Sequence, residues 1–586
     1  MALEPVTRKT RHAKLKSQWR LMPWLIGMLV PLLLLAACGG STPAQTSHPV
    51  SLPPLPSLSG LPAAALQGQL TGLVSPDTTL QLAIGLQVNR QGLAQMAQDI
   101  YNPSSPRYQK YLSVQQIADQ YGASAQTIQQ VSSWFTGQGF QVLDTSPLHT
   151  SLTVQANVLQ IAKTFQVTLQ TRLLDGRSFF GPSQAPVLPQ AIAPLITSIT
   201  GLDNFGQLLH APHPMQAQKA QQPNAGDCTL YSAFGVTRNQ LAKDYGVDQL
   251  FKLGYKGDGM TIGVVELGEP YSRNDVANYA TCNGVELHAR NINVDGNLPG
   301  GSGEGEAALD MEMIAGLAPN AQILDYQATT ADEKGFLDDI NQIAADDQVQ
   351  VVSISYGEGE DQTTPSYMAQ FNQSLEILAV EGISVFISSG DCAAYVDGVF
   401  GQLQVSFPAS APWATAVGGT KLSGSNEVAW SDSSPNKSQC QNTWGTGGGV
   451  SQNKGFPRPS WQTGAGVQNS DSNGNRQVPD VAALADNIAI YYRGFWSPVG
   501  GTSAAAPIWA AGTLLVDQAL KKQGKPPVAG VPTLYQIVNN PGKNHPFRDI
   551  TQGDNIFYKA GKGWDYPTGL GIPNFLDIGR VLGAKL

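Results

Sequence analysis

A short glycine-rich segment near the C-terminus places a serine where a nucleophile could act. Residues 500–507 read GGTSAAAP, so Ser503 follows two glycines and opens an apolar helix. Glycines let the backbone approach a ligand closely, and the first turn of a helix favours negative charge on the serine oxygen. Ser503 is therefore a candidate nucleophile. An N-cap serine on a buried helix is the alternative, and the segment alone does not decide between the two.

A serine nucleophile needs a base, which is usually a histidine. The chain has seven histidines, and only His288 and His545 lie in the C-terminal part that contains Ser503. Neither sits in a glycine-rich or helix-opening context. A Ser-His-Asp triad built on His288 remains an alternative, but the sequence does not favour it.

Two carboxyl groups offer another base. Residues 303–316 read GEGEAALDMEMIAG and predict a helix on which Glu306 and Asp310 share one face. Like charges side by side raise the pKa of one carboxyl, so a carboxylate held by a protonated neighbour could act as the base at acidic pH. A solvated acidic helix start is the alternative, and the flanking apolar residues argue against it.

A third candidate closes a predicted strand. Residues 387–391 read ISSGD, which places Asp391 at the carboxyl end of an apolar strand. A protonated aspartate there could donate a hydrogen bond to a developing oxyanion. A simple turn aspartate is the alternative.

The elements around these residues predict an α/β domain over 228–586. Apolar runs of strand length alternate with helical patterns: strands at 260–267, 321–326, 349–356, 383–388 and 414–417, and helices at 304–317, 334–346, 366–381 and 503–519. Nearly continuous apolar strands separated by helices predict a parallel sheet covered on both faces. Active sites of such folds gather at the carboxyl ends of the strands.

In their order along the chain, the helix with Glu306 and Asp310, the Ser-Gly-Asp strand end and the Gly-Thr-Ser-x-x-x-Pro segment resemble the sedolisin (serine-carboxyl peptidase, kumamolisin-like) family. The resemblance implies a subtilisin-like, doubly wound, mostly parallel sheet. It also implies that Ser503 is the nucleophile, Glu306 the general base, Asp310 its partner and Asp391 the oxyanion stabiliser.

The same resemblance implies a longer proton relay. Glu266, in the strand 262–268, matches an additional glutamate of the family. Its partner there is a tryptophan in a Ser-Ile-Ser-Trp-Gly segment, whereas residues 353–357 of this chain read SISYG, with Tyr356 in that position. A purely structural role for Glu266 is the alternative.

A candidate metal site lies near the C-terminus. Two aspartates bracket a glycine-rich loop in 548–565, and oxygen ligands of this kind suit a hard cation, although plain turns explain the loop equally well. The family resemblance implies one structural calcium ion, bound by the side chains of Asp549 and Asp565 and by the carbonyls of Ile550, Gly561 and Gly563.

Residues 66–205 predict a separate α+β domain of the ferredoxin type, because alternating strand patterns intersperse with helical segments. Residues 101–113, YNPSSPRYQKYLS, resemble the start of the family's activation pro-domain, which implies an intramolecular inhibitor. The polar, unpatterned segment 206–227 predicts an exposed linker, where we expect maturation cleavage.

The N-terminus predicts export. Residues 1–37 combine a basic start, an apolar core and the ending LAA before Cys38, which resembles a bacterial lipoprotein signal. The resemblance implies a lipid on Cys38 and a protein that is anchored to the cell membrane, or secreted after maturation; an uncleaved signal anchor is the alternative. Residues 38–65, rich in serine and proline, predict a disordered spacer.

Composition narrows the function further. With 35 basic and 44 acidic residues the formal net charge is -9, which argues against nucleic acid as a partner. No Cys-x-x-Cys pair occurs, which argues against a zinc ribbon or a thioredoxin-type redox centre. Sequence proximity, among three possible connectivities, favours two disulfides, Cys228–Cys282 and Cys392–Cys440.

The sequence therefore predicts an exported zymogen of an acid-active serine-carboxyl endopeptidase, which hydrolyses polypeptides through an acyl-enzyme. A tripeptidyl-peptidase and a catalytically silent peptide-binding lipoprotein on the same fold are the alternatives.

Overall fold

The computed structural model describes residues 50–206, 213–214, 228–268, 270–296, 298, 305–396, 402–432 and 444–586. The predicted signal peptide, Cys38 and most of the predicted linker lie outside these residues. No helix in the described ranges is both long and apolar enough to span a membrane.

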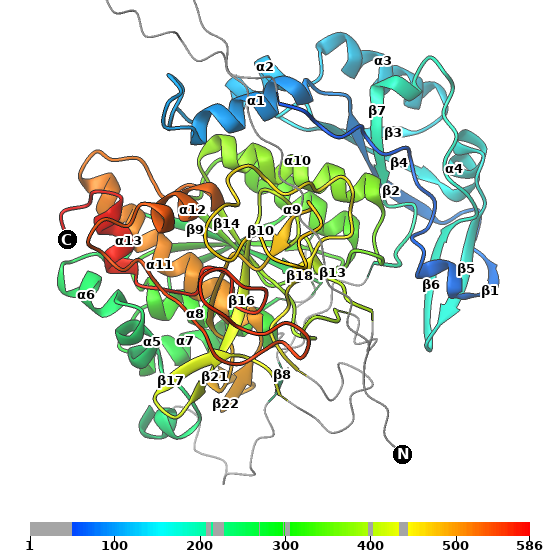
Figure 1. The fold of residues 1–586 in the computed structure, drawn as a ribbon. Helices are drawn as coiled ribbons and strands as arrows, with labels where there is room; N and C mark the ends of the chain where they lie inside the picture. Colours follow the sequence, from blue (N-terminus) through cyan, green and yellow to red (C-terminus); the bar gives the residue numbers. More distant parts are fainter. Residues whose placement is uncertain are drawn as a thin grey trace, which may run out of the picture. The chain divides into compact units, whose positions relative to one another are not determined.

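The predicted peptidase domain, residues 228–586, is built on an eight-stranded sheet (Figure 1). Its strands are β9 (Thr261–Leu267), β10 (Ala289–Asn293), β11 (Gln322–Ala328), β12 (Val351–Ile354), β14 (Ser384–Ser388), β16 (Thr415–Ser423), β17 (Asn426–Ala429) and β20 (Val481–Leu484). The order is β10-β11-β9-β12-β14-β16, and both β17 and β20 pair with β16. All pairs are parallel except β16 with β17, which confirms the predicted mostly parallel sheet.

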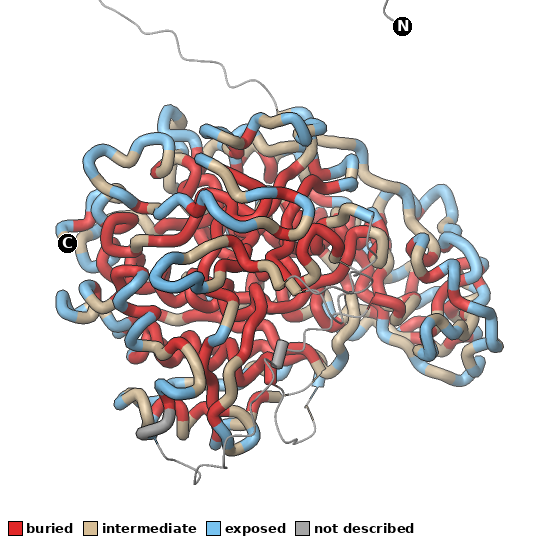
Figure 2. The backbone as a smooth tube through the Cα atoms, turned by 60° about the horizontal axis from the view of Figure 1, so that its bottom comes forward, coloured by how far each residue is buried: buried red, intermediate tan, exposed pale blue. Residues whose placement is uncertain are grey.

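Helices cover both faces of this sheet. Helices α8 (Gly305–Leu317) and α11 (Thr502–Lys522) lie on one face, and α9 (Glu333–Asp346) and α10 (Pro365–Glu381) lie on the other (Figure 1). Successive strand residues alternate between two cores: Val264 packs under α8 and α11, whereas Val265 packs under α9 and α10. Buried residues accordingly run through the sheet and its covering helices (Figure 2).

The pro-domain has a four-stranded antiparallel sheet in the order β3-β4-β2-β7. Its elements are β2 (Thr79–Leu86), α1 (Arg90–Tyr101), α2 (Val114–Tyr121), α3 (Ala125–Gly137), β3 (Gln141–Thr145), β4 (Ser151–Asn157), α4 (Val158–Phe165) and β7 (Ile196–Thr200). A second sheet, β1 (Gln69–Leu73), β5 (Leu169–Leu174) and β6 (Arg177–Pro182), is added to it. The β-α-β-β-α-β order of the main sheet is the ferredoxin-like arrangement.

Shorter elements complete the described chain. They are η1 (Ala65–Gln67), η2 (Ala193–Leu195), β8 (His213–Pro214), η3 (Cys228–Ala233), α5 (Arg238–Asp244), α6 (Val247–Lys252), α7 (Arg273–Cys282), β13 (Glu358–Gly359), β15 (Ser406–Phe407), β18 (Gly449–Val450), β19 (Gln477–Val478), β21 (Ile488–Tyr492), β22 (Phe495–Gly500), α12 (Val531–Asn539), β23 (Phe547–Arg548), β24 (Ile572–Pro573) and α13 (Phe575–Val581).

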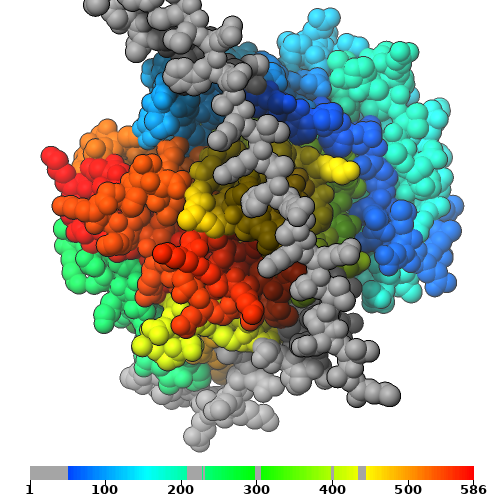
Figure 3. All heavy atoms as spheres, in the orientation of Figure 1, coloured from blue at the N-terminus to red at the C-terminus, as the bar shows by residue number. Residues whose placement is uncertain are grey.

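The pro-domain docks on helix α10. The hydroxyl of Tyr101 donates to the carbonyl of Ala379 at 2.9 Å, and the N–H of Leu112 donates to the carbonyl of Val380 at 3.1 Å. Strand β7 packs on the same helix. Figure 3 shows the blue and cyan pro-domain against green and yellow surfaces of the peptidase domain.

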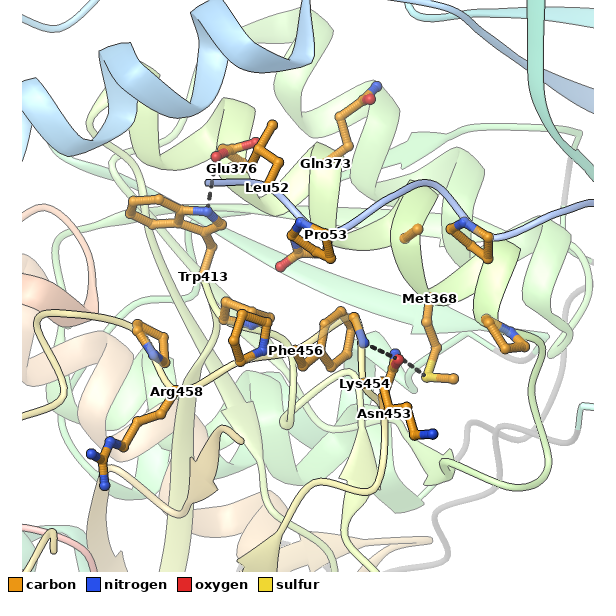
Figure 4. A pocket seen from close by; sticks show the side chains of 18 of the residues that line it. Leu52, Pro53, Met368, Gln373, Glu376, Trp413, Asn453, Lys454, Phe456 and Arg458 are labelled. Atoms are coloured by element: carbon orange, nitrogen blue, oxygen red, sulfur yellow. Dashed lines mark hydrogen bonds between the residues drawn. The ribbon is translucent and has the colours of Figure 1, made fainter. Parts of the chain in front are cut away.

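The described part of the predicted disordered spacer is held against this seam. The side chain of Gln91 donates to the carbonyl of Val50 at 2.6 Å. Residues 50–56 then line a cavity of 1230 Å³ together with α10 and the loop 452–461. In Figure 4, Leu52 and Pro53 lie across this cavity from Phe456. The segment lacks a core of its own, so side chains of α1 and the cavity walls order it instead.

One predicted disulfide is confirmed. Cys228 and Cys282 are bonded, which ties the start of the peptidase domain to the end of α7. Cys392 is disulfide-bonded as well. Its predicted partner, Cys440, lies outside the described residues, so that pairing stays a prediction.

Candidate active site

The candidate nucleophile sits in the first turn of α11. The N-cap of this helix is Gly501, with φ of 135°, and Thr502 is its first residue. Ser503 is therefore not the N-cap, which contradicts the alternative interpretation of the segment. Its side chain is 1% exposed, and within the described residues its Oγ has no hydrogen-bond partner. The packed apolar helix behind it leaves this hydroxyl available for chemistry rather than for capping.

Asp391 meets the start of α11, as its position after β14 predicts. Its Oδ1 accepts hydrogen bonds from the N–H of Thr502 at 2.7 Å and from Thr502 Oγ1 at 2.8 Å. Its Oδ2 lies 2.7 Å from the point that a Cβ on Gly501 would occupy. Only glycine combines this close approach with the backbone conformation of residue 501. The two glycines thus allow the Asp391 carboxyl to contact the backbone directly before Ser503.

Glu306 and Asp310 are both fully buried, which contradicts a solvated acidic helix start. Helix α8, which carries them, packs against α11. The hydroxyl of Ser355 links the two helices, because its Oγ lies 2.8 Å from Asp310 Oδ1 and 3.2 Å from the carbonyl oxygen of Ser503. Burial, with an added contribution from the charge of Asp325, raises the pKa of Asp310 well above its usual value.

Glu266 belongs to the same cluster. It is fully buried at the end of β9, and its Oε2 accepts a hydrogen bond from the hydroxyl of Tyr356 at 2.9 Å. Burial raises the pKa of Glu266 well above its usual value, and the carboxyl groups of Asp310, Asp325 and Glu306 raise it further. The tyrosine of the SISYG segment therefore contacts Glu266 directly.

The geometry leaves no role for an imidazole of the C-terminal domain. His288 is exposed and precedes β10, at the amino ends of the strands, whereas Asp391 follows the carboxyl end of β14. His545 is exposed as well. A buried carboxyl cluster beside a serine can accept a proton only while part of the cluster is ionised and can hold the next proton on a neighbour.

Two polar positions of the candidate site were missing from the sequence prediction. Ser355 and Asp325 are both fully buried beside the predicted acid pair. Each could have been noticed as a polar residue in an otherwise apolar run, because buried strands rarely contain polar side chains, and carboxylates least of all.

The predicted calcium loop brings its two aspartates together. Asp549 Oδ2 accepts from the N–H of Gly563 at 2.9 Å, and Asp565 Oδ2 accepts from the N–H of Gly561 at 2.7 Å. Burial, and to a smaller extent the charge of Asp549, raises the pKa of Asp565 to about 7. In the described ranges no group of three or more His, Cys, Asp or Glu side chains is arranged to hold a metal ion. Any cation here would need backbone carbonyls, such as that of Ile550, as further ligands.

Comparison with known proteins gives the same picture. Residues 67–205 match the pro-kumamolisin activation domain, and residues 296–531 match the subtilase family. Kumamolisin from Bacillus sp. (strain MN-32) is 34% identical over 422 residues, which cover 68% of this chain and 72% of kumamolisin. The chain belongs to the sedolisin family of kumamolisin-like peptidases. It is a serine-type peptidase made as a zymogen, with an activation domain in front of a subtilase domain.

Two further relatives frame this sedolisin-family peptidase. Human tripeptidyl-peptidase 1 is 27% identical over 87% of this chain and 93% of its own length. The solved structure of Pseudomonas sedolisin in complex with two molecules of pseudo-iodotyrostatin superposes with a TM-score of 0.51 at 27% identity. The superposition covers 60% of this chain and 98% of the sedolisin chain.

Proposed function

We propose that this sedolisin-family peptidase is an acid-active endopeptidase in which a carboxylate, not an imidazole, activates the serine. The observation that carries the proposal is that the Ser355 hydroxyl joins the buried Asp310 carboxyl to the main-chain carbonyl of Ser503, whereas both histidines of this domain are exposed. A carboxyl base with a proton-holding neighbour works at low pH, where an imidazole would be protonated.

The proposed steps take their residue roles from the family resemblance of these motifs. Glu306 accepts the proton of Ser503 Oγ as this oxygen attacks the scissile carbonyl. Asp310 holds a proton beside Glu306, and the O–H of a protonated Asp391 donates a hydrogen bond to the tetrahedral oxyanion. Glu306 then returns its proton to the leaving amine, and water hydrolyses the acyl-enzyme.

Asp391 must carry a proton on Oδ2 to act as a donor, because its Oδ1 already accepts two hydrogen bonds from Thr502. A second condition is that the Glu306–Asp310 pair keeps one proton. Burial of Asp310 favours the proton of this pair, and the pair loses it as pH rises, so we expect hydrolysis to peak on the acidic side. A peak above neutrality would contradict the mechanism.

The decisive experiment measures hydrolysis of a denatured protein at about pH 4. Ser503→Ala and Glu306→Gln should each abolish it, whereas His288→Ala and Glu312→Gln should spare it. Glu312 is a matched control, since it is an equally buried carboxyl on α8 whose Oε2 accepts from the N–H of Tyr491 instead. An active Glu306→Gln enzyme would refute the carboxylate base. A wild type without hydrolysis would favour the silent binding protein.

The similarity to tripeptidyl-peptidase 1 keeps one alternative open. A tripeptidyl-peptidase would release three-residue products from free N-termini, whereas an endopeptidase would cut within the chain. N-terminal sequencing of the products from a long peptide with a blocked N-terminus separates them, because only the endopeptidase cleaves it.

The position of the linker supports the proposal that the zymogen matures by cleavage there. Strand β8, within the predicted linker 206–227, pairs antiparallel with Val499 and Gly500, directly before the segment that carries Ser503. A linker paired there would lie beside the nucleophile and obstruct substrates until it is cut. We therefore expect self-cleavage within 206–227, detectable as a new N-terminus in the wild type and absent in Ser503→Ala.

A structural calcium ion in the loop of Asp549 and Asp565 is a further part of the proposal. The two carboxylates hold the same loop and carry like charges, and a bound divalent cation would offset that repulsion. Chelation should lower the melting temperature of the wild type and leave Asp565→Asn unchanged. Equal melting of the wild type with and without calcium would exclude the site.

We also propose a lipid on Cys38, which would tether the zymogen outside the cytoplasm. The support is the sequence before it, LAA, after an apolar core. Cys38→Ala should move the protein from the membrane fraction to the soluble fraction and remove the lipid mass from the N-terminal peptide. Retention of Cys38→Ala in membranes would favour the uncleaved anchor.

A further inference from the structure

One face of the sheet changes character beneath α8. The register places Asp325 of β11 beside Val264 of β9, and Gln327 beside Glu266. Paired residues of parallel strands point to the same face, so Asp325, Gln327 and Glu266 lie on the face that α8 and α11 cover. Farther back on the strands this face is apolar, with Ile262 and Val264 in the core. The polar residues gather at its carboxyl end, where Glu306 and Asp310 lie.

Asp325 is unusual within this group. It is fully buried, its Oδ2 accepts a hydrogen bond from Gln327 Nε2 at 2.6 Å, and its Oδ1 has no hydrogen-bond partner within the described residues. A buried carboxyl with an unsatisfied oxygen is costly to fold and calls for a functional explanation. The assigned roles of Ser503, Glu306, Asp310 and Asp391 do not use it.

The groups that face Asp325 are mainly acidic. Glu266 approaches it from β9, and Asp310 approaches it from α8. The charge of Asp325 also contributes to the raised pKa of Asp339 in α9. The hydroxyl of Tyr271 also feels that charge, and Arg273 Nη1 lies 3.4 Å from this hydroxyl.

No cation among these groups neutralises Asp325. Glu306 adds a further carboxyl to the cluster through Glu266. Asp325 thus lies among other carboxyl groups, and burial raises its pKa to about 8.

We propose that Asp325 is a positioning residue of the proton-holding cluster, which acts through Asp310 and Glu266 to keep the proton of Asp310 in place as pH rises. This inference rests on the proposed function of Glu306 and Asp310. The physical reason is coupled titration: every carboxyl added to a buried cluster makes the loss of the next proton harder for the others. Asp325 thereby extends the pH range over which Glu306 can act as the base.

The test is the pH profile of kcat/KM, measured between pH 3 and 8 with a fluorogenic peptide on enzyme matured from the full chain. In Asp325→Asn and Asp325→Leu the alkaline limb should move by about 1 pH unit toward acid, with KM at the optimum unchanged. Asp325→Glu should restore the wild-type limb. Glu312→Gln should leave the alkaline limb unmoved, because Glu312 is buried on α8 like Asp310 but accepts its hydrogen bond from the N–H of Tyr491.

An unmoved limb in Asp325→Asn, or a limb that moves to higher pH, overturns the inference. If these variants fail to mature, infrared titration of the Ser503→Ala zymogen decides instead. The band of the protonated buried carboxylic acids should disappear at lower pH in Ser503→Ala/Asp325→Asn than in Ser503→Ala; bands that disappear at the same pH in both proteins overturn the inference. The proposed function is tested separately, by the activities of Ser503→Ala and Glu306→Gln, which do not involve Asp325.

Discussion

The seam between the pro-domain and the peptidase domain carries a group of carboxyls whose titration should control docking. Asp203 of the pro-domain lies near Asp332 and Glu333 of the peptidase domain. The chain then passes so close that a Cβ on Gly206 would lie 2.9 Å from Glu358 Oε2. Burial, with a smaller contribution from Asp332, raises the pKa of Asp203 from 3.8 to about 6, although the N–H of Phe205 opposes the shift.

The size of the effect follows from that shift. A raised pKa means that docking is favoured in full below the ordinary value of 3.8, and that this contribution is lost as pH rises through about 6. Two pKa units correspond to about 3 kcal/mol. Because Asp203 is partly exposed, we halve this to about 1.5 kcal/mol, which is about tenfold in the docking equilibrium.

The substitution that isolates this effect is Asp203→Asn in the Ser503→Ala zymogen. An asparagine still accepts the Phe205 hydrogen bond through Oδ1 but does not titrate. We expect the two proteins to melt alike at pH 4, and the Asp203→Asn protein to melt a few degrees higher at pH 7. The exposed Asp175 offers a matched control, and Asp175→Asn should follow the parent protein at every pH. Parallel melting curves for Asp203→Asn and its parent, or a larger gap at pH 4 than at pH 7, would refute the reasoning.

Three further outcomes can be checked directly. Tyr356→Phe removes the hydrogen bond to Glu266, so kcat/KM at pH 4 should fall by up to about tenfold; an unchanged value would place Glu266 outside the relay. Cys228→Ser opens a bridge across 54 residues and should cost about 4 kcal/mol, seen as a lower urea midpoint of the Ser503→Ala protein; an equal midpoint would contradict it. Gly512→Ala would put a Cβ 2.1 Å from an aromatic ring of α13 and should cost about 1–3 kcal/mol by the same measurement, whereas a more stable variant would show that α13 can shift.

The sequence predicted those parts of the site that are continuous along the chain. The two glycines before Ser503 and the spacing of Glu306 and Asp310 are local features, so their conformations followed from local rules. The apolar strand runs predicted most of the central sheet because both of its faces are covered. Strand β10, with the sequence ARNIN, has few apolar residues and lies at the edge, so the same rule missed it.

The remainder of the site depends on register between strands, which a single sequence does not contain. Asp325 reaches Glu266 only because β11 pairs with β9 in one particular register, and a shift by one residue would turn it to the opposite face. Ser355 likewise joins Asp310 only after β12 is placed beside β9. In the linear sequence each is an isolated polar residue in an apolar run.

The pH dependences of the seam and of the active site run in the same direction, and this limits how the zymogen can be activated. At low pH the carboxyls around Asp203 and Glu333 are protonated and the pro-domain is held most tightly. In the proposed mechanism the Glu306–Asp310 pair also works at low pH. Acid therefore cannot activate the enzyme by loosening this seam. We expect acid to act instead through cleavage by Ser503 of the linker that pairs with β22, after which the severed pro-domain should leave most readily when the pH rises again.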